Sequence, residues 1–251
     1  MSRSLEGTVW THNDAGSTLF AVDEGGRILG SYEMPVRFRD WEDLAVAACG
    51  PERWCLYAAD VGDNYEERPS LRLIRLTEPP APDVGPEVAQ TRRTEPADVF
   101  PIRLPDGPRD IEALLVFPGE SVFLVTKGRN HPVTVYAYPG TLRPDTVTMT
   151  AVQELTDGPR ILPRQITGGS VAPDGRTAAL RSYQALQFYR LDGDTLAAVD
   201  GGRVNLASLG EPQGEGVALG DDGLVVLTSE GGPGGRAPSL AMLRCSVGGG
   251  R

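Results

Sequence analysis

Apolar and polar residues alternate in short runs along the whole chain, and turn residues separate these runs. No apolar period of 3.6 residues is sustained for long enough to indicate a helix, whereas the alternation is typical of strands that bury one face. The 31 glycines and 21 prolines suit many short turns. The pattern therefore predicts an all-β protein.

One four-residue pattern occurs four times, each time at the start of an apolar run. It reads Arg-Asp-Trp-Glu or Arg-Asp-Ile-Glu in the first two copies, and the other two keep polar residues at its second and fourth positions. The copies lie at 39–42, 109–112, 164–167 and 212–215, and their last residues are 70, 55 and 48 positions apart. Repeats of about 40–50 residues with strand content are typical of β-propellers. Each copy is thus predicted to open the inner strand of a blade.

The repeat divides the chain into blades of up to four strands each. The inner strands are expected at 42–47, 112–117, 169–172 and 215–219, and the second strands at 9–12, 55–61, 122–126, 177–182 and 224–229. The third strands are expected at 18–22, 71–76, 133–138, 186–191 and 239–244, and the fourth at 28–34, 99–104, 147–155 and 204–209.

This set contains five second and five third strands, but only four inner and four outer ones. Propellers avoid an unpaired edge when one terminus completes the blade that the other began. We therefore expect a single domain over residues 1–251, a five-bladed β-propeller that lacks the first inner strand and the closing outer strand. Both would lie in one segment upstream of residue 1. A rival register makes 6–10 an inner strand and 11–17 a turn. The segment 79–96, rich in Pro, Glu and Asp, is expected to be a long surface loop.

Charge and composition limit which kinds of binding partner and which cellular locations can be expected. The net charge of −10 gives no attraction to nucleic acid or to an anionic membrane. No apolar run is long enough to span a bilayer, and no signal peptide is visible. A missing upstream signal would place the protein in the periplasm or outside the cell; otherwise it would be cytoplasmic. Cys49 and Cys55 flank a turn and could form a disulfide or remain buried thiols, and Cys245 is expected in the core.

Polar residues gather where inner strands begin and second strands end. These two kinds of position meet at one end of the axis, because the paired strands are antiparallel. Residues two apart on a strand share a side, so the repeat predicts two tiers. The outer tier is Asp40, Asp110, Gln165 and Gln213, and the inner tier is Glu42, Glu112, Thr167 and Glu215; the facing strand ends and the loops after them bring His12, Asp14, Asp63, Asn64, Lys127, Arg181 and Glu230.

Three glutamates that converge near an axis cannot all stay ionised without compensation. A cation could lie among them, Arg39 and Arg109 could pair with them, or the channel could be wide and wet. Oxygen ligands without cysteine favour a hard ion, and Ca²⁺ over Mg²⁺ because Ca²⁺ accepts loose geometry. Calcium is therefore the expected cofactor.

Several motifs resemble those of a family of bacterial, mostly exported propeller proteins of uncertain function. They are Trp-Thr-His-Asn-Asp-Ala-Gly at 10–16, Arg-Asp-Trp-Glu-Asp at 39–43, Gly-Asp-Asn at 62–64, Asp-Ile-Glu-Ala at 110–113 and Gln-Gly-Glu-Gly at 213–216. Family members carry a further N-terminal inner strand that this chain lacks. The architecture also resembles the calcium-activated nucleotidases, or apyrases, which hold Ca²⁺ on the axis of a five-bladed propeller. That likeness implies ligand roles for Glu42, Glu112, Thr167 and Glu215.

Two interpretations of the function stay open. In the first, the metal is structural and the polar mouth binds a small molecule, peptide or glycan without chemistry, using Tyr65, Tyr183 and Trp41. In the second, the protein is a Ca²⁺-dependent hydrolase of phosphoesters or phosphoanhydrides. Its base would be one of Asp14, Asp63 and Glu230. His12, Asn64, Lys127 and Arg181 would hold the anionic substrate. With only two histidines and no nucleophile triad in sight, a serine hydrolase or zinc enzyme is not expected.

Overall fold

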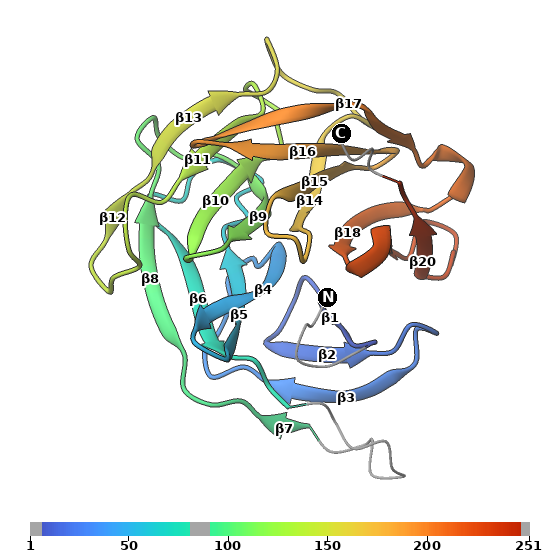
Figure 1. The fold of residues 1–251 in the computed structure, drawn as a ribbon, viewed down its shortest axis with the longest axis horizontal. Coiled ribbons are helices and arrows are strands. Elements are labelled where there is room, and N and C mark those ends of the chain that lie inside the picture. The colour runs from blue at the N-terminus through green and yellow to red at the C-terminus, as the bar shows by residue number, and fades with distance from the viewer. Residues whose placement is uncertain (1–6, 81–90, 247–251) are drawn as a thin grey trace.

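Five small β-sheets surround a common axis in the computed structural model, which describes residues 7–80 and 91–246 (Figure 1). The first sheet contains β1 (Val9–His12), β2 (Thr18–Val22), β3 (Ile28–Glu33) and β7 (Arg92–Arg93); the second contains β4 (Asp43–Gly50), β5 (Arg53–Asp60), β6 (Leu71–Thr77), β8 (Asp98–Arg103) and β12 (Val147–Thr148). The third contains β9 (Ile111–Phe117), β10 (Ser121–Thr126), β11 (Thr134–Ala137) and β13 (Thr150–Glu154); the fourth contains β14 (Ile166–Val171), β15 (Thr177–Ser182), β16 (Ala185–Asp192) and β17 (Thr195–Asn205); the fifth contains β18 (Gln213–Leu219), β19 (Leu224–Glu230) and β20 (Ser239–Arg244).

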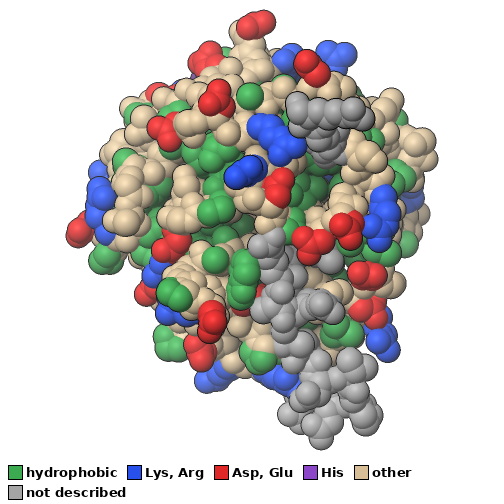
Figure 2. Space-filling view, in the orientation of Figure 1, with side chains coloured by type: hydrophobic (Ala, Val, Ile, Leu, Met, Phe, Trp, Pro, Cys, Tyr) green, Lys and Arg blue, Asp and Glu red, His purple; other side chains and the backbone are tan. Residues whose placement is uncertain are grey.

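These sheets form a five-bladed β-propeller, as the repeat predicted. Over the described ranges the regular structure is β-strand apart from two short 3₁₀ helices, Ala207–Leu209 and Asp221–Gly223. No helix among these residues has the length and apolar character that crossing a membrane requires. Acidic and basic side chains are interspersed on the face shown in Figure 2.

The blades are held together by apolar clusters between successive sheets. The inner strands β4, β9, β14 and β18 contact one another in that order around the axis. β9 is buried over its whole length, because sheets lie on both of its sides. The cluster between the fifth and first sheets is the smallest, with Val9, Val22 and Val226 as its buried members. Burial of apolar surface is the main favourable term in folding, and among the described residues this blade contact has the fewest buried apolar side chains.

The two incomplete blades lie where the strand count placed them. β1 is the innermost strand of the first sheet, and within the described residues no strand pairs with its axis-facing edge. Within the described part of the chain, the fifth sheet has three strands and its outermost is β20. The rival register is wrong for Thr11 and His12, which pair with Phe20 and Leu19 in a regular ladder and do not form a turn.

The structure corrects two outer strands and limits another expectation. The strand expected at 147–155 is divided, because Val147–Thr148 pairs with β8 in the second sheet and only β13 pairs with β11 in the third. The outer strand of the fourth blade is β17, not 204–209, because Gly193 adopts a φ of 59° and allows a tight hairpin directly after β16. Of the expected loop 79–96, residues 81–90 lie outside the described part, and Arg92–Arg93 pairs with β3 as a short parallel strand.

The three cysteines have distinct surroundings. Cys49 and Cys55 form a disulfide that joins β4 to β5, with their Cα atoms 5.7 Å apart. Cys245 is a free thiol that is partly buried and packs against the cluster of the fourth and fifth blades.

Candidate functional site

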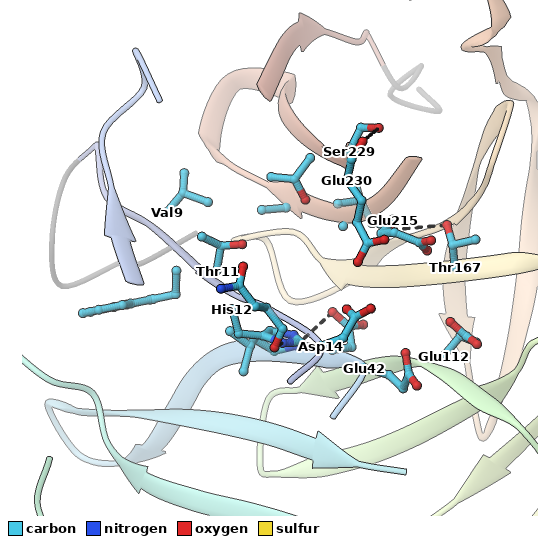
Figure 3. Close-up of a pocket in the computed structure, with 18 of the residues that line it drawn as sticks. Val9, Thr11, His12, Asp14, Glu42, Glu112, Thr167, Glu215, Ser229 and Glu230 are labelled. Carbon is cyan, nitrogen blue, oxygen red and sulfur yellow. Dashed lines mark hydrogen bonds between the residues drawn. The ribbon is translucent and has the colours of Figure 1, made fainter. Parts of the chain in front are cut away.

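A cavity of about 1270 Å³ lies along the axis (Figure 3). Its walls come from β1, β4, β9, β14, β18 and β19, so all five blades contribute. One end is polar and the remainder is lined mainly by valine, leucine and alanine. Twelve of the candidate residues line the polar end: His12, Asp14, Asp40, Glu42, Asn64, Glu112, Lys127, Gln165, Thr167, Gln213, Glu215 and Glu230.

Glu42, Asp110 and Glu112 form a compact acidic cluster. One carboxylate oxygen from each lies within 4.8 Å of the other two. The residues come from the starts of β4 and β9, which are neighbours at the axis. Burial, followed by repulsion from Glu112, raises the pKa of Glu42 to about 10. Burial likewise raises the pKa of Glu112 to about 8. Near neutral pH both glutamates therefore favour the protonated form, and further positive charge nearby would favour ionisation.

Positive charge at this cluster comes from Lys127 and Arg129. The Lys127 ammonium contacts Glu112 directly and lies 3.7 Å from Asp110. Arg129 is 2.7 Å from Asp110. Burial by itself would lower the pKa of Lys127, but the neighbouring carboxylates raise it overall. The arginine pairing considered from sequence involved Arg39 and Arg109. Arg39 is exposed, and the Arg109 guanidinium pairs with Asp106 instead.

A second polar group faces this cluster across the cavity (Figure 3). The Gln213 amide donates to Glu215 Oε1 at 2.8 Å and to Glu230 Oε2 at 3.0 Å. Burial and a side-chain hydrogen bond with Asp14 raise the pKa of Glu230 to about 7. Thr167 also lines the cavity, but its buried hydroxyl donates to the backbone carbonyl of Gly214 at 2.9 Å. The four inner-tier residues thus line one cavity, and the Thr167 hydroxyl joins two blades.

Three candidate residues lie outside the cavity wall. Asp110 is buried behind it and accepts a hydrogen bond from the Asp63 backbone N–H at 3.0 Å. The Asp63 carboxylate accepts from the Arg68 N–H at 2.7 Å, which fixes the loop after β5. Arg181 is fully buried and donates to the Gly216 carbonyl at 2.6 Å. In the structure, Asp63 and Arg181 hold loops and blades in place.

Two residues shape the loop that carries Asp40 and Glu42: Asp60, the last residue of β5, and Gly62, which follows that strand. Asp60, fully buried, accepts hydrogen bonds from the backbone N–H groups of Arg39 and Asp40 at 3.2 and 2.9 Å. A Cβ at Gly62 would lie 2.0 Å from a Glu42 carboxylate oxygen. Gly62 therefore leaves the space that the two acidic side chains occupy.

Aromatic residues near the mouth have different roles. Trp41 is 1% exposed, and its indole N–H donates to the Asn13 carbonyl at 2.7 Å. His12 packs against Trp41 with ring centroids 4.1 Å apart, and burial lowers the pKa of the imidazole. Tyr183 lines the cavity, whereas Tyr65 is 86% exposed. Trp41 therefore packs between blades, and Tyr183 faces the cavity.

Asp43 is the residue at the axis that sequence reasoning missed. Its Oδ2 accepts hydrogen bonds from the backbone N–H groups of Leu114 at 2.8 Å and Gly169 at 3.1 Å, and Oδ1 accepts from Leu44 at 2.9 Å. One carboxyl group thereby links β4, β9 and β14. Burial raises its pKa to about 8, against the effect of these hydrogen bonds. The sequence did contain a signal for this role, because Asp43 is an acidic residue within an otherwise apolar inner strand.

Comparison with known proteins finds similar solved structures but no related sequence. No protein-family model matches the chain, and no curated protein matches it in sequence. Similar solved structures are β-propeller proteins, including the PQQ-bound aldose sugar dehydrogenase of Streptomyces coelicolor, with 14% identity over 95% of this chain and 91% of that chain and a TM-score of 0.49. The periplasmic gluconolactonase of Pseudomonas aeruginosa has 12% identity, coverage of 97% and 69%, and a TM-score of 0.47.

A third similar structure is virginiamycin B lyase of Staphylococcus aureus, with 10% identity, 89% of this chain covered and a TM-score of 0.46. This chain spans 59% of the length of that lyase. At these identities the likeness concerns the fold alone.

Proposed function

We propose that this propeller binds Ca²⁺ at the polar end of its axis and uses the adjoining cavity to bind a ligand without chemistry. The observation that carries the proposal is the convergence of Glu42, Asp110 and Glu112, whose oxygens lie within 4.8 Å of one another. Carboxylate oxygens are the ligands that Ca²⁺ prefers, and the cluster contains no cysteine or histidine.

The electrostatics support a cation at this place. Both glutamates have pKa values raised by burial and by neighbouring carboxylates, so a divalent ion would favour their ionised forms. Glu215 and Thr167 line the same cavity and are the next available oxygen donors. The ligand roles inferred for Glu42, Glu112, Thr167 and Glu215 belong to this proposal, with Asp110 as an added member.

Lys127 is the internal competitor of the metal. Its ammonium contacts Glu112 and lies near Asp110, so it neutralises the charge that Ca²⁺ would otherwise compensate. Calcium entry requires this ammonium to move away. The substitution Lys127→Met removes this charge and should therefore tighten calcium binding. If the Lys127–Glu112 ion pair is purely structural, neither the wild type nor Lys127→Met should bind calcium.

Calorimetric titration of chelator-treated protein with CaCl₂ tests the proposal. We expect heat of binding in the wild type, tighter binding in Lys127→Met and loss of binding in Glu112→Gln. Glu154→Gln, at an exposed position on β13, is the matched control and should bind as the wild type does. At a hundred-fold excess over Kd, calcium should stabilise the fold by about 2.7 kcal/mol. Absence of heat and of any shift in melting temperature in both wild type and Lys127→Met would refute the site.

The second candidate function is calcium-dependent hydrolysis of a phosphoester or phosphoanhydride. It is favoured by Glu230, whose pKa is raised to about 7 beside Asp14 in the cavity, in the range of a general base. Asp63 is less suited to that role, because its carboxylate holds the Arg68 backbone. Nucleotides and p-nitrophenyl phosphate should be screened with CaCl₂ and with EGTA. EGTA-sensitive turnover that Glu230→Gln abolishes would favour the enzyme, and calcium binding without turnover would favour the binding module.

A further inference from the structure

The hairpin that joins β4 to β5 carries a disulfide beside an arginine (Figure 1). Cys49 Sγ is bonded to Cys55 Sγ, and the Nε–H group of Arg53 donates to Cys49 Sγ at 3.3 Å. No carboxylate among the described residues pairs with Arg53, so its guanidinium has the sulfur as its partner there. The Arg53 carbonyl oxygen lies further from the same sulfur, at 3.6 Å. A positive charge therefore lies next to one sulfur of the pair.

The two sulfurs differ in accessibility. Cys49 is partly exposed on β4, whereas Cys55 is 2% exposed and belongs to the apolar cluster between the second and third blades. The β4–β5 ladder shifts register between Ala48 and Gly50, so Cys49 has no partner strand residue opposite it. A bulge of this kind turns the side chain that it carries in a new direction. A small molecule in solvent therefore reaches Cys49 and not Cys55.

Charge and burial also give the two thiols of the reduced protein different reactivity. The thiolate is the nucleophile in cysteine chemistry, and a neighbouring arginine stabilises it. The Arg53 guanidinium stabilises a thiolate at Cys49, whereas the apolar surroundings of Cys55 disfavour one. Cys49 is thus suited to react first with an oxidant, and Cys55 is suited to react with the oxidised Cys49.

We propose that Cys49 and Cys55 form a peroxide-sensitive thiol pair, in which Cys49 is oxidised first and Cys55 then closes the disulfide. The Cys49 thiolate attacks the terminal oxygen of a hydroperoxide, ROOH. The O–O bond breaks, and the alkoxide that leaves takes up the proton that the Cys49 thiol released. The Cys55 thiol then attacks the Cys49 sulfenic acid, the S–O bond breaks, and water leaves with the thiol proton. Two thiols lose two electrons, and the hydroperoxide gains them.

The same asymmetry makes the disulfide slow to reduce. An external thiolate can attack only the accessible Cys49 sulfur, and this attack expels Cys55 as a thiolate in apolar surroundings. Exchange is slow when the leaving thiolate is poorly stabilised. The disulfide therefore forms readily, persists, and keeps β4 joined to β5. This inference depends neither on calcium nor on the axial cavity.

The test follows thiol loss in protein that has been reduced, freed of reductant and placed in EGTA at pH 7. The variant Cys245→Ser is the background, so that only the pair contributes thiols. Hydrogen peroxide is the probe, and a colorimetric assay counts the remaining thiols. Arg53→Gln removes the charge and Arg53→Lys keeps it, while Arg203→Gln, exposed on β17, is the matched control. Dimedone traps the sulfenic acid in Cys55→Ala, and peptide mass spectrometry locates the adduct.

We expect peroxide to remove both thiols, and Cys49 to carry the dimedone adduct. Arg53→Gln should slow thiol loss about threefold, a size of effect that an exposed charge pair can supply, and Arg53→Lys and Arg203→Gln should not slow it. Brief alkylation with iodoacetamide should modify Cys49 before Cys55, and this measurement needs no substitution in the pair. An unchanged rate in Arg53→Gln, earlier modification of Cys55, or thiols that survive peroxide would overturn the proposal.

Discussion

Removing the Asp43 carboxylate should destabilise the whole propeller, although Asp43 is not one of the predicted metal ligands. Its oxygens accept hydrogen bonds from three backbone N–H groups, and two of these groups belong to the neighbouring inner strands β9 and β14. An N–H left without an acceptor in a buried position costs about 1–3 kcal/mol. Leaving the N–H groups of Leu114 and Gly169 without this acceptor would therefore cost about 2–6 kcal/mol. Asp43 also borders the cavity, where water can replace part of the loss, so we expect about 3 kcal/mol for Asp43→Ala.

Urea unfolding at pH 7 in EGTA measures this effect. Asp43→Asn keeps one oxygen, which can still accept the two N–H groups from β9 and β14, and should cost about 1 kcal/mol. Asp194→Ala, in the exposed turn between β16 and β17, is the matched control and should remain within about 0.5 kcal/mol of the wild type. A loss below about 1 kcal/mol in Asp43→Ala, or a larger loss in Asp43→Asn, would refute the assignment of Asp43 as the link between blades.

Two further predictions concern pH and redox state. The folded pKa values of Glu42 and Glu112, about 10 and about 8, lie above the ordinary value of 4.5. Both groups therefore contribute stability that is complete below pH 4.5 and is lost as pH rises toward these values. Urea unfolding in EGTA should show lower stability at pH 8.5 than at pH 6, with a smaller difference in Glu112→Gln; a rise in stability would contradict this. Reduction of Cys49–Cys55, six residues apart, should cost about 2 kcal/mol by loop entropy. Equal melting temperatures with and without reductant would contradict a stabilising role for this disulfide. The variant Cys245→Ser is the control and should show the same drop in melting temperature on reduction as the wild type.

Local sequence patterns were sufficient to predict the architecture. Strand periodicity and the spacing of the four-residue pattern placed β1, β2, β15 and β20 with the bounds that the structure has. These features depend on neighbours in the chain, because alternation sets which face is buried and turn residues set where a hairpin closes. β17 was misplaced from sequence because the two-residue turn Gly193-Asp194 was not recognised, although that signal is local.

The sequence predicted which polar residues meet at one end of the axis, but it did not predict which of them contact one another. Antiparallel pairing brings the starts of inner strands to the ends of their partners, so the meeting of Glu42, Glu112, Glu215 and Glu230 followed from topology. Which cation lies beside which carboxylate did not follow, because Lys127 and Arg109 are equally plausible partners until the loops have a shape.

The sequence by itself determined the all-β class, the number of blades and the end of the axis that carries the acids. Only the tertiary structure decided that Asp43 joins three blades, that Arg181 is buried, and that one cavity is lined by all five blades. The physical reason is that these features depend on distances between segments more than 30 residues apart, and such distances are fixed by packing between sheets.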